Sequence, residues 1–82
     1  MDRTLIDDTV RKYLARALDI DAASIDSSQS MKDLGANSLD IVEIVSSSMR
    51  ELRIKIPRDE LKDITNIDGL VDALHDKALA KQ

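Results

Sequence analysis

The stretch "DLGANSLDIVEIV", residues 33–45, decides how the rest of the chain is interpreted. It passes from a glycine-containing turn into an apolar-periodic segment, so a helix is expected to begin beside Ser38. Asn37 and Ser38 are both good capping residues, and Asp40 places negative charge in the first turn. The hydroxyl at this junction is therefore either a cap or a group held free at the positive end of a helix.

Three segments carry the apolar spacing of amphipathic helices, a fourth allows a short helix opened by proline, and no segment shows the alternation of a strand. Helices are expected over about residues 4–18, 38–52 and 57–64, and a fourth begins at Ile67. The predicted fold class is all-α: a bundle of three main helices and one short helix, in a single domain that spans residues 1–82. Because the chain holds one aromatic residue, its core must be aliphatic.

Local signals mark the starts of these helices. Thr4 with Asp7 resembles a capping box at the start of the first helix. Pro57 suits the opening of the short third helix, because the N–H that it lacks has no partner there. Asn66 can cap the fourth helix.

An apolar stripe is expected to attach the helix over residues 38–52 to the rest of the bundle. Its predicted members are Leu39, Val42, Val45, Met49 and Leu52. Ile44 is expected on the flank of this stripe, and Ile41 at the surface. Three consecutive serines, residues 46–48, lie mid-helix, where some must face solvent or bond to the preceding turn.

Residues 19–37 connect the first two helices without a helical period. The segment is rich in Asp, Ser and Asn, which favour turns and caps. A structureless loop of this length is unusual in a compact domain. Four apolar residues recur through it and are expected to pin it across the bundle: Ile20, Ile25, Met31 and Leu34.

The charge of the chain is acidic and uneven. Its 12 basic and 16 acidic residues give a net charge of −4, and residues 1–49 hold five of the basic and nine of the acidic ones. A nucleic-acid-binding protein should show a basic face, so nucleic acid is not an expected partner. The absence of cysteine excludes disulfides and thiolate chemistry. Without a signal-peptide pattern or an apolar run that could span a bilayer, a cytoplasmic location and no membrane partner are expected.

Catalytic and metal sites are not indicated. His75, the only histidine, would need an orienting partner and oxyanion donors to act with Ser38 as a hydrolase. A surface histidine late in a helix is the simpler interpretation. Asp19, Asp21 and Asp26 lack the spacing of an EF-hand loop, and no glutamate closes them. We therefore expect no enzyme activity and no metal site.

Ser38 has a setting that the other serines lack. If Asn37 caps the helix, Ser38 is its first residue and its side chain lies at the rim of the positive end. A phosphate ester there would meet free backbone N–H groups. Gly35 permits a close approach of the loop. The junction is therefore suited to carrying a phosphodiester as well as to capping.

The sequence resembles the acyl carrier protein family. The stretch "DLGANSLDIVEIV" is similar to the family's Asp-x-Gly-x-Asp-Ser-Leu motif followed by an amphipathic helix, and the Ile-Pro pair at 56–57 and the helix order also match. The resemblance covers nearly the whole chain. It implies a four-helix bundle with a 4′-phosphopantetheine arm esterified to Ser38 and acyl groups held as thioesters. The chain would then be a non-catalytic carrier, and the reactive sulfur would belong to the cofactor.

The family's other motif positions match residues of this chain one by one. Asp33 and Leu34 match the loop approach, with Leu34 as a buried anchor. Leu39 follows the serine and is implied to lie beside the arm. Asp40 and Glu43 match the acidic start of the helix that partner enzymes read through basic residues. The residues predicted to contact partners are accordingly Asn37, Leu39, Asp40, Ile41, Glu43 and Arg50.

Two departures separate the chain from the usual pattern. Asn37 stands where the family usually has an aspartate, which removes one negative charge beside the attachment site. The later part of the helix and the segment after it, residues 50–58, are basic, whereas fatty-acid carriers are usually acidic in this part of the helix. A partner that reads a run of carboxylates would find fewer of them, which argues against a housekeeping role in fatty-acid synthesis.

The segments "GANS", "KIPRDEL" and "NIDGLVD" resemble those of freestanding polyketide carriers, in particular carriers that work with a hydroxymethylglutaryl-synthase-like enzyme in β-branching. Such a carrier would supply acetyl or a related short acyl group. The implied partners are a phosphopantetheinyl transferase, an acyltransferase, a ketosynthase or the synthase-like enzyme, and the family implies a monomer. Two alternatives stay open: a fatty-acid-synthesis carrier, and a cofactor-free helical protein-interaction module.

Overall fold

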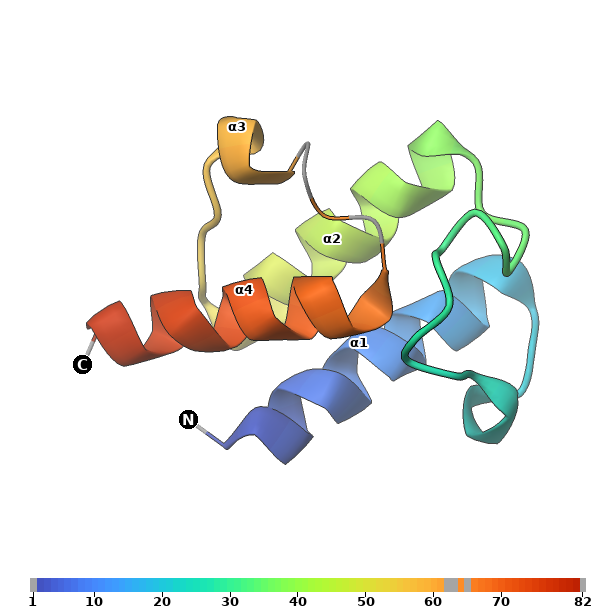
Figure 1. Cartoon of the computed structure of the whole chain (residues 1–82), viewed down its shortest axis with the longest axis horizontal. Coiled ribbons are helices and arrows are strands. Elements are labelled where there is room, and N and C mark those ends of the chain that lie inside the picture. The colour runs from blue at the N-terminus through green and yellow to red at the C-terminus, as the bar shows by residue number, and fades with distance from the viewer. Residues whose placement is uncertain (1, 62–63, 65, 82) are drawn as a thin grey trace.

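The computed structural model describes residues 2–61, 64 and 66–81, and this part of the chain forms three long helices and one short one (Figure 1). In chain order the helices are α1 (Arg3–Leu18), α2 (Ser38–Leu52), α3 (Arg58–Leu61) and α4 (Ile67–Lys81). The described residues contain no strand, and one isolated antiparallel bridge joins Ser30 to Asn66. The predicted all-α class, with three main helices and a short one, is confirmed.

The long helices enclose an aliphatic core. Helix α1 contacts both α2 and α4, and Figure 1 shows α4 crossing the front of the molecule with α1 and α2 behind it. Buried side chains come from all three, namely Ile6, Val10, Leu14, Ile44, Val45, Leu52, Ile67, Leu70, Val71, Leu74 and Ala78. The apolar spacing read along the fourth helix is therefore its buried face.

The start of α1 differs from the prediction. Asp2 is the N-cap, and its side chain accepts a hydrogen bond from the backbone N of Thr4 (3.0 Å). The predicted capping box of Thr4 with Asp7 is wrong, because the helix begins before Thr4 could cap it. Asp7 instead accepts a hydrogen bond from Arg11 Nε (2.9 Å) one turn later.

The long loop between α1 and α2 is pinned as predicted. Ile25 and Met31 are buried, while Ile20 and Leu34 are partly buried and pack against the core. A 3₁₀ turn, η1 (Ala22–Ser24), occupies its first part. The guanidinium of Arg11 adds a polar attachment, since its Nη1 donates to the carbonyl of Ile25 (2.6 Å).

The same loop also caps α4. The first N–H groups of a helix have no partner inside it. Here the N–H of Ile67 donates to the carbonyl of Gln29 (3.4 Å) and that of Asp68 to the carbonyl of Ser27 (3.0 Å). Asn66 Oδ1 accepts from the N–H of Gly69 (2.7 Å), which confirms Asn66 as a capping residue. The loop is therefore held between α1 and α4 before it delivers the chain to the start of α2.

Helix α3 is a single turn that follows Pro57. The N–H groups of Glu60 and Leu61 donate to the Pro57 carbonyl (3.0 and 3.3 Å). The predicted helix over 57–64 is too long, because Ile64 is not helical. Residues 62 and 63 lie outside the described part of the chain.

Candidate functional site

Asn37 caps α2. Its Oδ1 accepts a hydrogen bond from the backbone N of Asp40 (2.8 Å), and Asp40 Oδ2 accepts one from the backbone N of Asn37 (3.1 Å). This reciprocal pair is a capping box, and it determines where the helix begins. The alternative in which Ser38 is the cap is excluded, and the predicted range of α2 is confirmed at both ends.

Ser38 is the first residue of α2, and its side chain is exposed. Within the described part of the chain its hydroxyl makes no hydrogen bond, and neither do the backbone N–H groups of Ser38 and Leu39. A free nucleophile thus lies beside two free donors at the positive end of a helix. An anionic group esterified there would be stabilised by the donors and by the helix dipole.

The turn before α2 depends on Gly35. Its φ is +100°, a conformation that residues with a Cβ rarely adopt. No atom lies within 4 Å of the position that a Cβ would take, so the expected close approach of the loop is wrong and the backbone angle is the reason for glycine. The carbonyl of Met31 accepts from the N–H groups of Leu34 and Ala36 (3.2 and 3.1 Å), which closes the turn.

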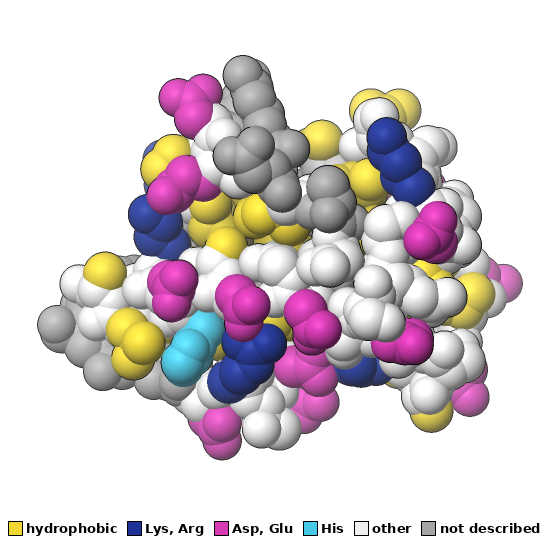
Figure 2. All heavy atoms as spheres, viewed as in Figure 1, with side chains coloured by type: hydrophobic (Ala, Val, Ile, Leu, Met, Phe, Trp, Pro, Cys, Tyr) yellow, Lys and Arg dark blue, Asp and Glu magenta, His cyan; other side chains and the backbone are white. Residues whose placement is uncertain are grey.

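An apolar groove of about 690 Å³ runs from Ser38 along one side of α2. Its other walls are α3 and the connections on either side of that helix. Figure 2 shows hydrophobic side chains at the surface in the hollow above α4, on the side of α3. The residues on its lining include Met31, Ile41, Val42, Val45, Met49, Lys55, Ile56, Pro57 and Leu61. Ile41 is therefore partly buried against the core, and its predicted exposure is wrong.

The buried face of α2 is rotated from the predicted stripe. Leu39 and Val42 were expected inside, but they are 80% and 62% exposed. Ile44, expected on the flank, is 1% exposed. Ser48 is fully buried, and its hydroxyl donates to the carbonyl of Ile44 (2.8 Å), one turn earlier, so its polar group is satisfied inside the core. The predicted stripe is thus wrong at Leu39 and Val42, and right at Val45 and Leu52.

Charge changes sign along the exposed face of α2. Glu43 and Arg50 are exposed seven residues apart, about two turns on one face, and neither makes an ion pair within the described residues. Glu51 is held by α1 instead, because Lys12 Nζ and the Tyr13 hydroxyl donate to its Oε1 (2.6 and 2.7 Å). These bonds lower the pKa of Glu51 and raise that of Tyr13.

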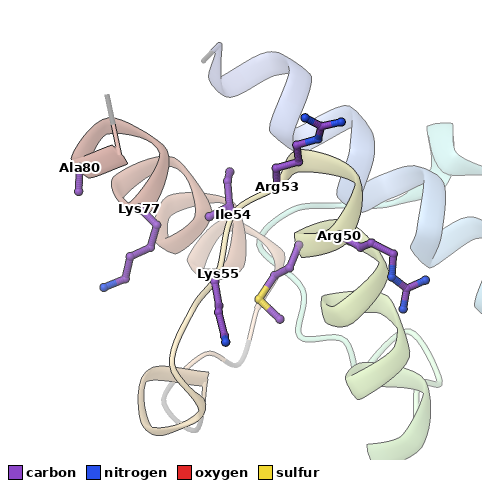
Figure 3. A pocket seen from close by; sticks show the side chains of 7 residues that line it. Arg50, Arg53, Ile54, Lys55, Lys77 and Ala80 are labelled. Atoms are coloured by element: carbon purple, nitrogen blue, oxygen red, sulfur yellow. The ribbon is translucent and has the colours of Figure 1, made fainter.

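The end of α2 therefore presents cations to solvent. Arg50, Arg53, Lys55 and Lys77 surround a shallow cavity of about 510 Å³ between the ends of α2 and α4 (Figure 3). Figure 3 shows their side chains pointing in different directions, with Arg53 toward α1. They do not converge on a single anion.

The residues considered for other chemistry lie apart from Ser38. His75 is a half-buried residue of α4. Among the described residues, no group of three or more His, Cys, Asp or Glu side chains is placed to hold a metal ion. In that same part of the chain, no helix is long and apolar enough to cross a membrane.

The chain is similar to known carrier proteins. Residues 8–74 match the family described as "Phosphopantetheine attachment site". The acyl carrier protein of Helicobacter pylori (strain J99 / ATCC 700824) is 33% identical over 72 residues, which are 87% of this chain and 92% of that protein. The polyketide biosynthesis acyl-carrier-protein AcpK of Bacillus subtilis (strain 168) is 32% identical over 78 residues, 94% of this chain and 95% of that protein.

This chain belongs to the phosphopantetheine-attachment family of acyl carrier proteins. Its prosthetic group is covalently bound 4′-phosphopantetheine, and the chain is a non-catalytic carrier that presents substrates to enzymes. The alternative of a cofactor-free interaction module therefore does not hold. The geometry at the start of α2 fits the cofactor, because an exposed hydroxyl, free N–H donors and an apolar groove lie together.

Proposed function

We propose that Ser38 is the residue that carries the arm and that the chain delivers short acyl groups in polyketide assembly. The observation that supports the attachment site is the free, exposed hydroxyl of Ser38 on the first turn of a helix that Asn37 already caps. The Ser38 Oγ would form a bond to the β-phosphorus of coenzyme A. The pyrophosphate P–O bond would break, the adenosine bisphosphate would leave, and the serine proton would pass to a base of the transferase.

The attachment site is tested by intact mass. The protein is incubated with coenzyme A, magnesium and a broad-specificity phosphopantetheinyl transferase. Wild type and Ser46→Ala should each gain one phosphopantetheine, and Ser38→Ala none. Ser46 is the matched control because it lies two turns along α2 and lines the same groove. Addition to Ser38→Ala, or no addition to the folded wild type, would overturn the assignment.

The polyketide pathway is supported by charge. Fatty-acid partners that read carboxylates would find Glu43 available but would meet Arg50 and Lys55 farther along the same side of the molecule. Glu51 offers them little, because Lys12 and Tyr13 already bind its carboxylate. The name of the AcpK relative, a polyketide biosynthesis carrier, points the same way.

The pathway is tested with a fatty-acid-type malonyltransferase, supplied with malonyl-coenzyme A. The acceptors are the holo forms of this chain and of the Helicobacter pylori carrier. We expect slower transfer to this chain, and a faster rate for its Arg50→Glu variant, because like charges at a docking surface slow association. Equal rates for the two carriers would favour the fatty-acid alternative.

The resemblance supports a narrower role, delivery of acetyl or a related short acyl group to a hydroxymethylglutaryl-synthase-like enzyme in β-branching. The test supplies the acetyl-loaded carrier to such a synthase with a β-ketoacyl acceptor carrier, and follows both carriers by mass. The role is supported if this chain loses its acetyl group and regains the free thiol while the acceptor gains that acetyl group plus one water, as expected for aldol addition followed by hydrolysis. Acetyl that stays on this chain, while a known donor carrier reacts, contradicts it.

A further inference from the structure

The groove beside α2 has chemically different ends. Ser38 lines it at the start of α2, and Lys55 lines it in the connection to α3. The N–H of Ile56 contacts Met49 Sδ (3.3 Å), which places the segment that carries Lys55 beside the last turns of α2. Lys55 and Met49 also line the basic cavity of Figure 3. A ligand that followed the groove from Ser38 would cross an apolar wall and end beside a cation.

The length of the groove matches that of the arm. Met49 follows Ser38 by eleven residues, which is about 16 Å along a helix. From the serine oxygen to its sulfur, phosphopantetheine has about fourteen bonds. An extended chain advances about 3.5 Å per three bonds, so the arm also spans about 16 Å. An arm laid along the groove therefore brings its sulfur, and the acyl group attached to it, level with Met49 and close to Lys55.

Lys55 is the cation that lines the groove at this end, whereas Arg50, Arg53 and Lys77 line only the neighbouring cavity. Lys77 pairs with Glu60 (2.9 Å), and Arg53 points toward α1 in Figure 3. Lys55 is exposed and makes no ion pair with any residue that the structure describes. A lysine can lay its aliphatic stem along an apolar wall and keep its ammonium in solvent. The groove therefore ends beside one solvent-exposed ammonium group and not in an enclosed binding site.

We propose that the acyl group docked in this groove is one with a free carboxylate, the half-thioester of a short dicarboxylic acid such as malonate, and that Lys55 selects it. This inference rests on attachment at Ser38 and is independent of the β-branching role, in which the carried acetyl group is neutral. The carboxylate of such a group lies two carbons beyond the thioester carbonyl, within reach of the lysine, whereas a neutral acyl group gains nothing there. An exposed pair of this kind favours the docked form by about 1.5- to 5-fold.

The test compares two acyl groups of equal size. Malonyl and acetoacetyl have the same number of non-hydrogen atoms, but a carboxylate in one is a methyl ketone in the other. Each is loaded from its coenzyme A thioester by the transferase, and intact mass confirms loading. The methyl resonances of Val45 and Ile56, which line the groove, then report the docked fraction by NMR. We expect a 1.5- to 5-fold larger docked fraction for malonyl at low salt and a smaller difference at high salt.

Substitutions test whether the Lys55 side chain causes the preference for malonyl. Lys55→Gln should remove the difference between the two acyl groups, and Lys55→Glu should reverse it. Lys32→Gln is the matched control, because Lys32 is an exposed lysine in the loop before Ser38 and does not line the groove. It should leave the malonyl preference intact. Equal docking of both groups in wild type, or a preference that survives Lys55→Gln, would overturn the proposal.

This outcome is separate from the fate of the attachment site. If Ser38 does not carry the arm, either wild type gains no mass or Ser38→Ala still gains it, and the mass spectrum alone shows this. If the arm is attached but Lys55 does not favour the carboxylate, both acyl forms appear by mass. The methyl shifts of Val45 and Ile56 are then the same in the two forms.

Discussion

Replacing Asn37 with alanine should destabilise the protein, whereas replacing Ser38 with alanine should not. Both are exposed residues with small polar side chains at the start of α2. They differ in one respect. Asn37 Oδ1 accepts a hydrogen bond from the N–H of Asp40 (2.8 Å), whereas the Ser38 hydroxyl makes no hydrogen bond within the described residues. The comparison therefore measures which side chain the helix needs.

The magnitudes follow from the cap. Loss of an N-cap acceptor costs about 1 kcal/mol, which for a chain of 82 residues corresponds to a Tm lower by about 4–8 °C. Ser38→Ala removes no hydrogen bond and should change the free energy of unfolding by less than about 0.5 kcal/mol. Asn37→Asp keeps the acceptor and adds a negative charge at the positive end of the helix, so it should stabilise by about 0.3–1 kcal/mol.

The assay is urea unfolding of the unmodified protein, followed by far-ultraviolet circular dichroism, with the slope m required to be the same for all variants. The same samples are then offered to the transferase. Asn37→Ala should still accept phosphopantetheine, and Ser38→Ala should not. If Ser38→Ala lost as much stability as Asn37→Ala, the hydroxyl would be a structural cap, and the argument that it is free for modification would fail.

Three further predictions concern the scaffold. Ile44→Ala, at a site only 1% exposed, should cost about 2–5 kcal/mol in urea unfolding; a loss below 1 kcal/mol would contradict the assigned buried face of α2. Gly35→Ala should cost about 1 kcal/mol or more, because φ is +100° while the space is open; an unchanged unfolding midpoint would contradict this. Hydrogen bonds from Lys12 and Tyr13 lower the pKa of Glu51 below its ordinary value of 4.5. Its contribution to stability should be complete above pH 4.5 and lost as pH falls through the lowered pKa; a pH profile of unfolding that Glu51→Gln leaves unchanged would refute it.

Local signals in the sequence are enough to locate α2 and to narrow its cap to Asn37 or Ser38. The apolar spacing of residues 38–52 and the polar residues at the start of this segment are local patterns that the sequence reports directly. The pinned loop was also predictable, because apolar residues such as Ile25 and Met31 stand out in a polar segment. How the loop is fastened was not, since Arg11 and the first turn of α4 lie far from it in sequence.

The groove could not be found from the sequence because its walls meet only in the tertiary structure. Ile41 and Lys55 come from α2 and from the segment after it, and nothing in their spacing shows that both border one cavity. The candidate attachment residue, Ser38, is indicated by the motif around it. That Ser38 is not the cap, however, is shown only by the structure, in which Asn37 and Asp40 form the capping box.

The error in the buried stripe of α2 has a functional explanation. The helix carries apolar side chains around most of its circumference, so a stripe through Leu39 and Val42 fits the helical period as well as one through Ile44. Burial of Ser48 settles the choice, because its own hydrogen bond to Ile44 makes a polar residue acceptable in the core. Leu39 and Val42 are then largely exposed, and Val42 lines the groove. We propose that these exposed apolar residues, on the helix that begins at the proposed attachment site, form a surface for the arm and for partner enzymes.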